Sequence, residues 1–482
     1  MTTEAVPSGI PVPHSNDVES EENDIREHLM HDPRPRAELN RMVMESMQVT
    51  PKSFWVIVGI LALLVAVCLF GAWLYMIMKG MGVAGIRRPT FWAMLIANFV
   101  FWIGISHAGT FVSAILRVFK AEFRRPITRA AELMTAFGLA AGAMYPLIHL
   151  GRVWVGYWII PYPNQRWLWP NFRSPLVWDL LAITTYLLGS IMYIYLPLIP
   201  DLAMARDHST GWRYQFYRIL SFGFTGAEGE WQRIRTAITI FAFAIIPVMF
   251  SVHTIVSWDF AMTKTPGWHS TIFGPFFIAG AIFSGVSAVA MILFIVRASM
   301  KNMDYFIRKE HFDAFGKLIL VFSFVWAYFY FNEFLLAWYA GDASDQFVWN
   351  AITQGPNAWL WYLMLVLNIG IPWLTLWNKK VRRTPWMLFV IGFLINIGMY
   401  IERYIIVPGM ITVNRFPFQW GDYGPRIELV ISVGSLSLFL LLYALASRLI
   451  PLIPVWEVVE GQHATQLRRI GKAKVPTVTN LE

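Results

Sequence analysis

Cysteine and charge are both scarce in this chain. Its 482 residues include one cysteine, Cys68, and 14% are charged, whereas about a quarter are charged in an ordinary soluble domain. A single thiol cannot build a disulfide, a cysteine-rich zinc site or an iron–sulfur cluster. Any such centre must therefore belong to a partner. A phosphate-binding glycine loop is not evident either, which argues against an ATP-driven pump.

Long apolar runs fill the chain instead, and 56% of its residues are hydrophobic. About twenty helical residues span a bilayer core, so these runs predict an all-α, polytopic membrane protein with ten transmembrane helices. The predicted spans are 54–77, 91–116, 132–157, 177–196, 236–262, 273–297, 314–338, 358–377, 386–406 and 427–450. Polar tails are predicted at 1–53 and 451–482. The first tail has no pattern of a cleavable signal peptide, so we expect the first span to act as the insertion signal.

Lysines and arginines set the predicted orientation. Most of those in the connecting loops follow the second, fourth, sixth and eighth spans, although the whole chain carries a formal charge of +9. The positive-inside rule then places both termini in the cytoplasm.

The outward loop at 158–176 is rich in Trp, Tyr and Pro, which suits an interfacial aromatic belt, a lid over a lipophilic substrate, or a docking face for an outer subunit. The inner loop at 197–235 is long enough for a surface helix.

Ionisable side chains inside the spans are the candidate functional residues, because charge at membrane depth is costly. With this orientation, His149 at the outer end of the third span and Asp179 at the start of the fourth share one level. A neutral histidine and a carboxylate can together hold a hydroquinone and take its protons. Arg152 and Tyr145 would share the helix face of His149. The structural alternative is that Asp179 caps its helix and that Arg152 extends towards lipid headgroups.

Two more candidates, His253 and Asp259, lie towards the outer end of the fifth span. Six residues separate them, about 120° away from a common helix face, so they cannot both point into one pocket of a regular helix. His253 shares its face with Ser257, and a hydrogen bond to a neighbouring helix is the commoner role of such a histidine. A bis-histidine haem between His149 and His253 is formally possible, and is the main chemical rival to a quinol site.

Four charged or polar residues remain as candidates for proton transfer or structural pairing. Glu333 and Glu402 lie in the outer halves of the seventh and ninth spans, and Arg403 follows Glu402. An ion pair between Glu333 and Arg403 is as plausible as a proton path. His107 lies deeper, towards the inner side of the second span, where it could belong to a half-path from the cytoplasm.

Several of these segments resemble the NrfD/polysulfide-reductase membrane-subunit family, and within it the ActC-type subunits of bacterial alternative complex III. The resemblance covers about residues 40–455 and rests on ten spans, "AMYPLIHLGRVW" in the third, Asp179, and "FSVHTIVSWDF" in the fifth. It implies two four-helix bundles, at about 91–262 and 273–406, with two flanking helices. It further implies a bacterial inner-membrane subunit without intrinsic haem or iron–sulfur cluster that binds quinol, menaquinol in preference to ubiquinol, near its outer face.

The resemblance also implies roles for particular residues and partners. His149 and Asp179 match the catalytic positions, while His253, Asp259 and Arg403 lie in matching segments. The quinol-binding set would then be Tyr145, Arg152, His253, Asp259 and Arg403. Electrons would pass to an iron–sulfur subunit on the outer face and on to c-type cytochrome subunits, beside a sister membrane subunit.

Two other functions stay open from the sequence. The chain could translocate ions or protons, or it could anchor redox subunits without a quinol site of its own. Pro146, Pro247 and Pro372 break three spans, but they do not form the matched halves typical of transporters.

Overall fold

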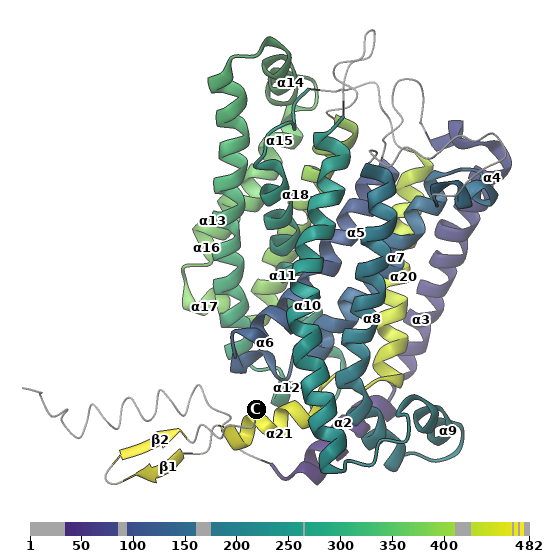
Figure 1. The fold of residues 1–482 in the computed structure, drawn as a ribbon, viewed down its shortest axis with the longest axis vertical. Coiled ribbons are helices and arrows are strands. Elements are labelled where there is room, and N and C mark those ends of the chain that lie inside the picture. The colour runs from purple at the N-terminus through teal and green to yellow at the C-terminus, as the bar shows by residue number, and fades with distance from the viewer. Residues whose placement is uncertain are drawn as a thin grey trace, which may run out of the picture.

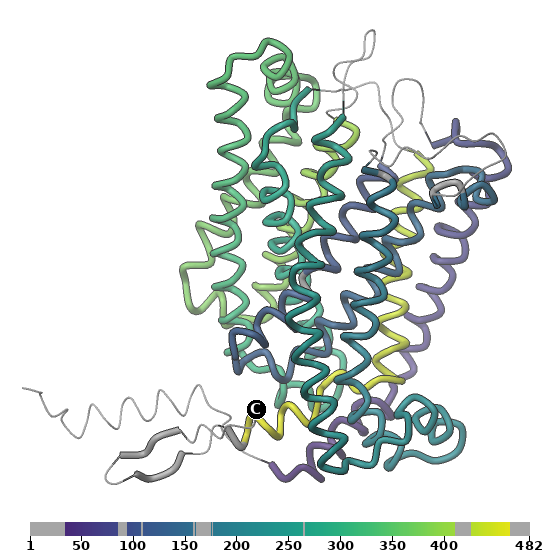
Figure 2. Tube along the Cα trace, viewed as in Figure 1, coloured from purple at the N-terminus to yellow at the C-terminus, as the bar shows by residue number. Residues whose placement is uncertain are grey.

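The computed structural model describes residues 34–84, 94–160, 175–263, 266–409 and 426–464, together with two short strands beyond them. Within these residues, ten helices are long and apolar enough to cross a membrane, so the predicted number of spans is confirmed and the protein is an integral multi-pass membrane protein. Figures 1 and 2 show them as one bundle of long, roughly parallel helices. The spans are Lys52–Lys79, Met94–Val118, Thr128–His149, Val177–Asp207, Glu228–Ala261, Phe273–Ser299, Lys309–Ala340, Ala358–Thr375, Pro385–Gly409 and Ile427–Leu449.

The elements that carry these spans are α3 (Lys52–Leu64), η1 (Val65–Gly71), α4 (Ala72–Lys79), α5 (Met94–Thr110), η3 (Phe111–Ile115), α6 (Leu116–Val118), α7 (Thr128–His149), α8 (Pro175–Asp207), α10 (Glu228–Ala261), α11 (Phe273–Ser299), α13 (Lys309–Ala340), α15 (Ala358–Leu365), η6 (Val366–Gly370), α16 (Ile371–Thr375), α18 (Pro385–Tyr404), η7 (Ile405–Gly409) and α20 (Ile427–Leu449). The connecting elements are α2 (Arg36–Gln48), η2 (Met81–Ala84), η4 (Glu122–Arg124), η5 (Val153–Ile159), α9 (Gly211–Leu220), α12 (Met303–Phe306), α14 (Ala343–Gln354), α17 (Lys379–Arg382), α21 (Val455–Ala464), β1 (Leu467–Ile470) and β2 (Ala473–Pro476).

Two groups of four helices form the body of the molecule. In the first group, α5 packs on α7, α7 on α8, and α8 on α10. In the second group, α11 packs on α13 and α18, and α15 packs on α18. The groups meet where α11 lies against α5 and α10. The pair α3 and α20 flanks the first group, with α20 against α7 and α3 outermost (Figure 1).

The elements α2, α9 and α21 lie at one end of the bundle, and α4 and α14 lie at the other (Figure 1). We call the first end inner, after the predicted cytoplasmic side, and the other end outer. The expected surface helix on the inner side is α9, whose Trp212 and Ile219 side chains are exposed. The cytoplasmic placement of the two tails stays a prediction, and most of the outward loop, residues 161–174, lies outside the described residues.

The third span ends earlier than predicted. The helix α7 stops at His149 rather than near residue 157, because Gly151 takes the left-handed conformation (φ +69°) and breaks the helix. Side-chain atoms of Met81 would lie 2.7 Å from a Cβ at Gly151, so the position is also crowded. Arg152 therefore does not share a helix face with His149 and Tyr145, and that prediction was wrong.

Close approach of α5 and α7 holds the first group together. A Cβ at Gly109 would lie 2.0 Å from Thr135 Oγ1 and 2.1 Å from the Ala131 carbonyl oxygen. Thr135 uses this proximity to donate a 2.8 Å hydrogen bond to the carbonyl of Ser106. Small residues that let helix backbones touch are the usual means of association within a membrane, where hydrophobicity itself gives no driving force.

The last helix, α21, fastens the inner loops by ion pairs. The Glu457 carboxylate accepts hydrogen bonds from Arg117 and, at 2.6 Å, from Arg124, while Glu460 pairs with Arg235 at 2.7 Å. Burial alone would raise the pKa of Glu457, but the guanidinium groups of Arg117 and Arg124 outweigh it and hold this pKa at about 2. The helix therefore links the segment before α7 to the start of α10.

We expect acid to release α21. Because the pKa of Glu457 is about 2 in the fold and 4.5 in a free side chain, its contribution, roughly 3 kcal/mol, is complete above pH 4.5 and falls as the pH drops towards 2. A spin label on Val459→Cys, in a Cys68→Ser background, should become mobile across this range. The same label with Glu457→Gln should be mobile at neutral pH. An immobile label in both proteins at every pH would contradict the assignment.

Candidate functional site

Two carboxyl groups meet at the outer end of the first helix group. Asp179 lies in the second turn of α8 and Asp259 lies near the last turn of α10, and each is 7% exposed. The two side chains share a hydrogen bond. Asp179 therefore does not act as a helix cap in this structure, and the carboxyl that faces it comes from the fifth span.

A hydrogen bond between two carboxyl groups requires one proton, because a carboxylate can only accept. Two negative charges side by side in a buried site are also strongly unfavourable. The pair is therefore one proton donor and one proton acceptor. The Oδ1 atom of each carboxyl group is buried, so the pair is held away from bulk solvent.

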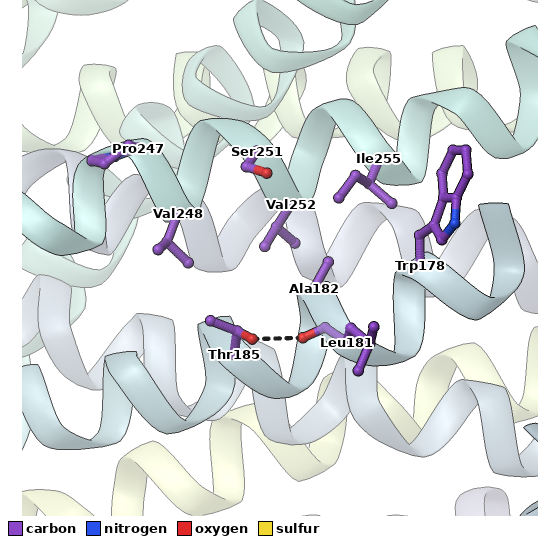
Figure 3. A pocket seen from close by; sticks show the side chains of 9 residues that line it. All are labelled: Trp178, Leu181, Ala182, Thr185, Pro247, Val248, Ser251, Val252 and Ile255. Atoms are coloured by element: carbon purple, nitrogen blue, oxygen red, sulfur yellow. Dashed lines mark hydrogen bonds between the residues drawn. The ribbon is translucent and has the colours of Figure 1, made fainter. Parts of the chain in front are cut away.

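An apolar cavity of about 540 Å³ lies between α8 and α10, the two helices that carry this pair (Figure 3). Trp178, which precedes Asp179, lines its outer end, and Ile255, one turn before Asp259, lines the facing wall. The ring of Trp178 also meets the edge of Trp258 at 5.9 Å. A pair of polar groups at the end of an apolar cavity is the usual composition of a site for a largely apolar ligand.

His149 and Tyr145 both lie on α7 but have different surroundings. His149 is half-buried at the last position of the helix, at the same end of the bundle as Asp179. Tyr145 is fully buried and its hydroxyl makes a 2.7 Å hydrogen bond to Ser435 of α20. Arg152, beyond the end of α7, is exposed. The structure therefore keeps His149 at the level of the carboxyl pair and engages Tyr145 in holding the flanking helix.

His253 points away from Asp259, as their separation along α10 predicts. Its Nε2 hydrogen-bonds the carbonyl of Phe277 on α11 at 3.0 Å, which is the helix-to-helix contact expected as the commoner role. One face of its ring stacks on Phe277, and the ring centre of His107 lies 4.7 Å away. His107 itself stacks on Tyr186 of α8. These two histidines form a packed column between α5, α8, α10 and α11.

The charges of the second helix group pair differently from the prediction. Arg403 lies 2.8 Å from Glu402, its neighbour in sequence, and its guanidinium covers the ring of Phe277 at 4.3 Å. Glu402 also accepts a 2.7 Å hydrogen bond from Trp326. Glu333 accepts a hydrogen bond from Ser270 instead, so the ion pair between Glu333 and Arg403, one of the two alternatives left open by the sequence, does not form. Glu402, the neighbour of Arg403 on α18, supplies the carboxylate that pairs with the guanidinium. Arg403 therefore does not need Glu333 of α13 as its partner.

A buried ion triad at the inner end was not predicted from the sequence. Arg129 pairs with both Glu132 and Asp201 at 3.1 Å, and Ser113 donates to Glu132 at 2.9 Å. Arg129 and Glu132 are three residues apart, which is a detectable helical pairing. Asp201 was harder to predict, because the predicted fourth span ends at residue 196, whereas α8 continues to Asp207.

Side-chain hydroxyl groups lie between the triad of Arg129, Glu132 and Asp201 and the histidine column of His107 and His253. The Tyr186 hydroxyl contacts Thr110 at 2.8 Å and the Ser106 carbonyl at 3.4 Å. Thr110 lies one turn from Ser113, which bonds the triad. Among the described residues, no three His, Cys, Asp or Glu side chains gather as they would around a metal ion.

The sequence itself matches a family model described as "Polysulphide reductase, NrfD" over residues 82–414. The chain belongs to the NrfD family. It is 26% identical to a Halobacterium salinarum protein named as a membrane subunit of dimethyl sulfoxide reductase, over 82% of this chain and 90% of that one. It is 23% identical to the Hdr-like menaquinol oxidoreductase integral membrane subunit of Archaeoglobus fulgidus, over 83% and 96%.

A third relative is a protein of Mesobacillus selenatarsenatis named as a subunit of selenate reductase, which is 21% identical over 87% of this chain and 97% of that protein. The family resemblance inferred from the sequence is therefore confirmed. The matched region includes the carboxyl pair, His149, the histidine column and Arg403.

Removing one member of the Glu402–Arg403 pair should destabilise the fold strongly. Each is at most 2% exposed, so Arg403→Gln or Glu402→Gln leaves an uncompensated buried charge, at a cost of about 3–5 kcal/mol. The double variant should lose less than the sum. The exposed pair Lys301 and Glu45 is the control, and we expect its two single substitutions to leave the unfolding temperature almost unchanged. Thermal unfolding in detergent measures both cycles, and additive losses at Glu402 and Arg403 would refute the pairing.

Proposed function

We propose that this NrfD-family chain is the quinol-oxidising membrane subunit of a respiratory or photosynthetic electron-transfer complex. The observation that carries the proposal is the buried pair Asp179 and Asp259, with an apolar cavity between the two helices that bear it. A quinol has two hydroxyl donors on an apolar ring and tail, and these features match the two parts of the site. His149, the last residue of α7, lies at the same end of the bundle as the pair. It is the second proton acceptor in this proposal.

Oxidation of one quinol releases two protons and two electrons, and the chain must receive or pass on each of them. The ionised member of the carboxyl pair accepts one hydroxyl proton, and the neutral ring of His149 accepts the other. The shared proton of the pair keeps one carboxyl as a donor that orients the quinol oxygen. The two electrons leave for an iron–sulfur centre of a partner subunit, so the chain alone should not turn over.

The comparisons support the class of substrate and partners. The Archaeoglobus fulgidus relative is named as a menaquinol oxidoreductase subunit, and the other two relatives are named as subunits of reductases. We extend this to menaquinol here and to an iron–sulfur subunit on the outer face, c-type cytochrome subunits and a sister membrane subunit, as in ActC-type chains of alternative complex III. The loop cations support an orientation that places the carboxyl pair at the outer side of a bacterial inner membrane.

Asp179→Asn or Asp259→Asn should abolish quinol oxidation by the intact complex. Either change removes one carboxyl group and, with it, the hydrogen bond between the two carboxyl groups. Loss of a positioned proton acceptor lowers the rate of quinol oxidation by a factor of about 10²–10⁴. Quinol-dependent cytochrome reduction measures the rate, after haem and iron–sulfur signals have shown normal assembly. Asp345→Asn on α14, at the same end, should keep the wild-type rate. Unchanged rates in both pair variants would refute the proposed site.

A second candidate function, proton translocation, is favoured by the polar side chains that join the inner triad to the histidine column. This line runs from Asp201 and Glu132 past Tyr186 to His107 and His253 in the first helix group. Glu333 and Glu402, which the sequence suggested for the same path, lie in the second group. A proton path through His107 would therefore use different carboxyl groups from those suggested.

Tyr186→Phe separates the two functions. It removes the hydroxyl that links Thr110 to Ser106 while keeping the aromatic ring against His107. If the line conducts protons, the number of protons moved per electron should fall in proteoliposomes, while quinol turnover in detergent stays within about twofold of wild type. An unchanged ratio would leave quinol oxidation as the function of this chain.

A further inference from the structure

We infer that the cavity between α8 and α10 holds the isoprenoid tail of the quinol and forms the route by which the quinol reaches the carboxyl pair from the membrane. This inference rests on the proposed function, because it assigns the tail of a ligand whose headgroup binds at Asp179 and Asp259. It adds a binding site that fixes which quinols the protein can use.

The cavity runs from the level of Trp178 and Ile255 towards the middle of the membrane. Trp178 lines it beside Asp179, and Pro247 lines it twelve residues before Asp259 on α10, about 18 Å deeper at 1.5 Å per residue. Below Thr185 the two helices close on each other, since a Cβ at Gly189 would lie 3.1 Å from Ile245 Cδ1. The cavity therefore ends within one helical turn of Asp179 and Asp259 along the chain at its outer end, and it is closed at its inner end.

The lining chemistry suits a hydrocarbon. Val248, Val252 and Ile255 face it from α10, opposite Leu181 and Ala182 of α8 (Figure 3). The hydroxyl of Thr185 is satisfied within its own helix by a 2.7 Å hydrogen bond to the Leu181 carbonyl. Ser251 brings the other hydroxyl among the lining residues, and the rest of the wall is apolar.

Charge complementarity selects a quinol over a phospholipid. A phospholipid chain in the cavity would bring a negative phosphate towards Asp179 and Asp259, which already carry one negative charge between them. A quinol brings two neutral hydroxyl donors to the same position. Its tail gains little free energy on leaving lipid for an apolar wall, because both surroundings are apolar. The gain is positional: a tail in the cavity keeps the headgroup at the carboxyl pair.

Filling the cavity should penalise tailed quinols selectively. We would compare Thr185→Trp with Thr184→Trp in the intact complex in nanodiscs; both residues are exposed, but Thr184 does not line the cavity. Thr185→Trp should raise the KM for a long-chain menaquinol at least tenfold and leave the kinetics of tail-less menadiol within twofold. Thr184→Trp should leave both unchanged. Ser251→Phe on α10 provides the same test if Thr185→Trp does not assemble.

Asp179→Asn, measured with both quinols, distinguishes failure of this inference from failure of the proposed function. Loss of both activities in Asp179→Asn, with selective loss in Thr185→Trp, supports both assignments. A second outcome is that Asp179→Asn loses activity while Thr185→Trp affects both quinols equally or affects neither. That outcome overturns the tail site and keeps the quinol site. Wild-type rates in Asp179→Asn overturn the quinol site and, with it, the assignment of the tail.

Discussion

Every ionisable group in the membrane-spanning part must find its partner within the protein, because hydrocarbon offers no water to solvate it. The described helices meet this constraint at separate levels. Arg129 lies between Glu132 and Asp201 at the inner end, and Arg403 lies against Glu402 in the second helix group. The packing of α5, α7 and α8 is thus decided as much by where charges can be neutralised as by the shapes of apolar side chains.

The carboxyl pair differs from these groups, and the difference points to function. The inner triad and the Glu402–Arg403 pair bring opposite charges together, so they stabilise one arrangement of helices. Asp179 and Asp259 bring like groups together, and no cation among the described residues pairs with them. Such an arrangement is costly for stability alone, and the role proposed above, a proton acceptor for quinol, would account for it.

The sequence was sufficient for the fold class because twenty-residue apolar runs have few alternatives. It was less informative about helix ends: α8, α10 and α13 extend well past the bilayer thickness on polar residues that hydropathy does not count. Periodicity separated Asp259 from His253, yet only the packing of α8 on α10 reveals that Asp179 is its neighbour. Arg152 was misplaced because one glycine conformation, at Gly151, decides where α7 stops.

The position of α21 at the end of the chain has a consequence for biosynthesis. Glu457 and Glu460 neutralise Arg117, Arg124 and Arg235, but they are translated after all ten spans. While the helices insert, the inner loops keep their full positive charge, which is the signal that retains loops on the cytoplasmic side. The ion pairs can form only once the last helix leaves the ribosome. In the predicted orientation, the chain would use the same arginines twice, first as topology signals during insertion and then as the attachment points of α21.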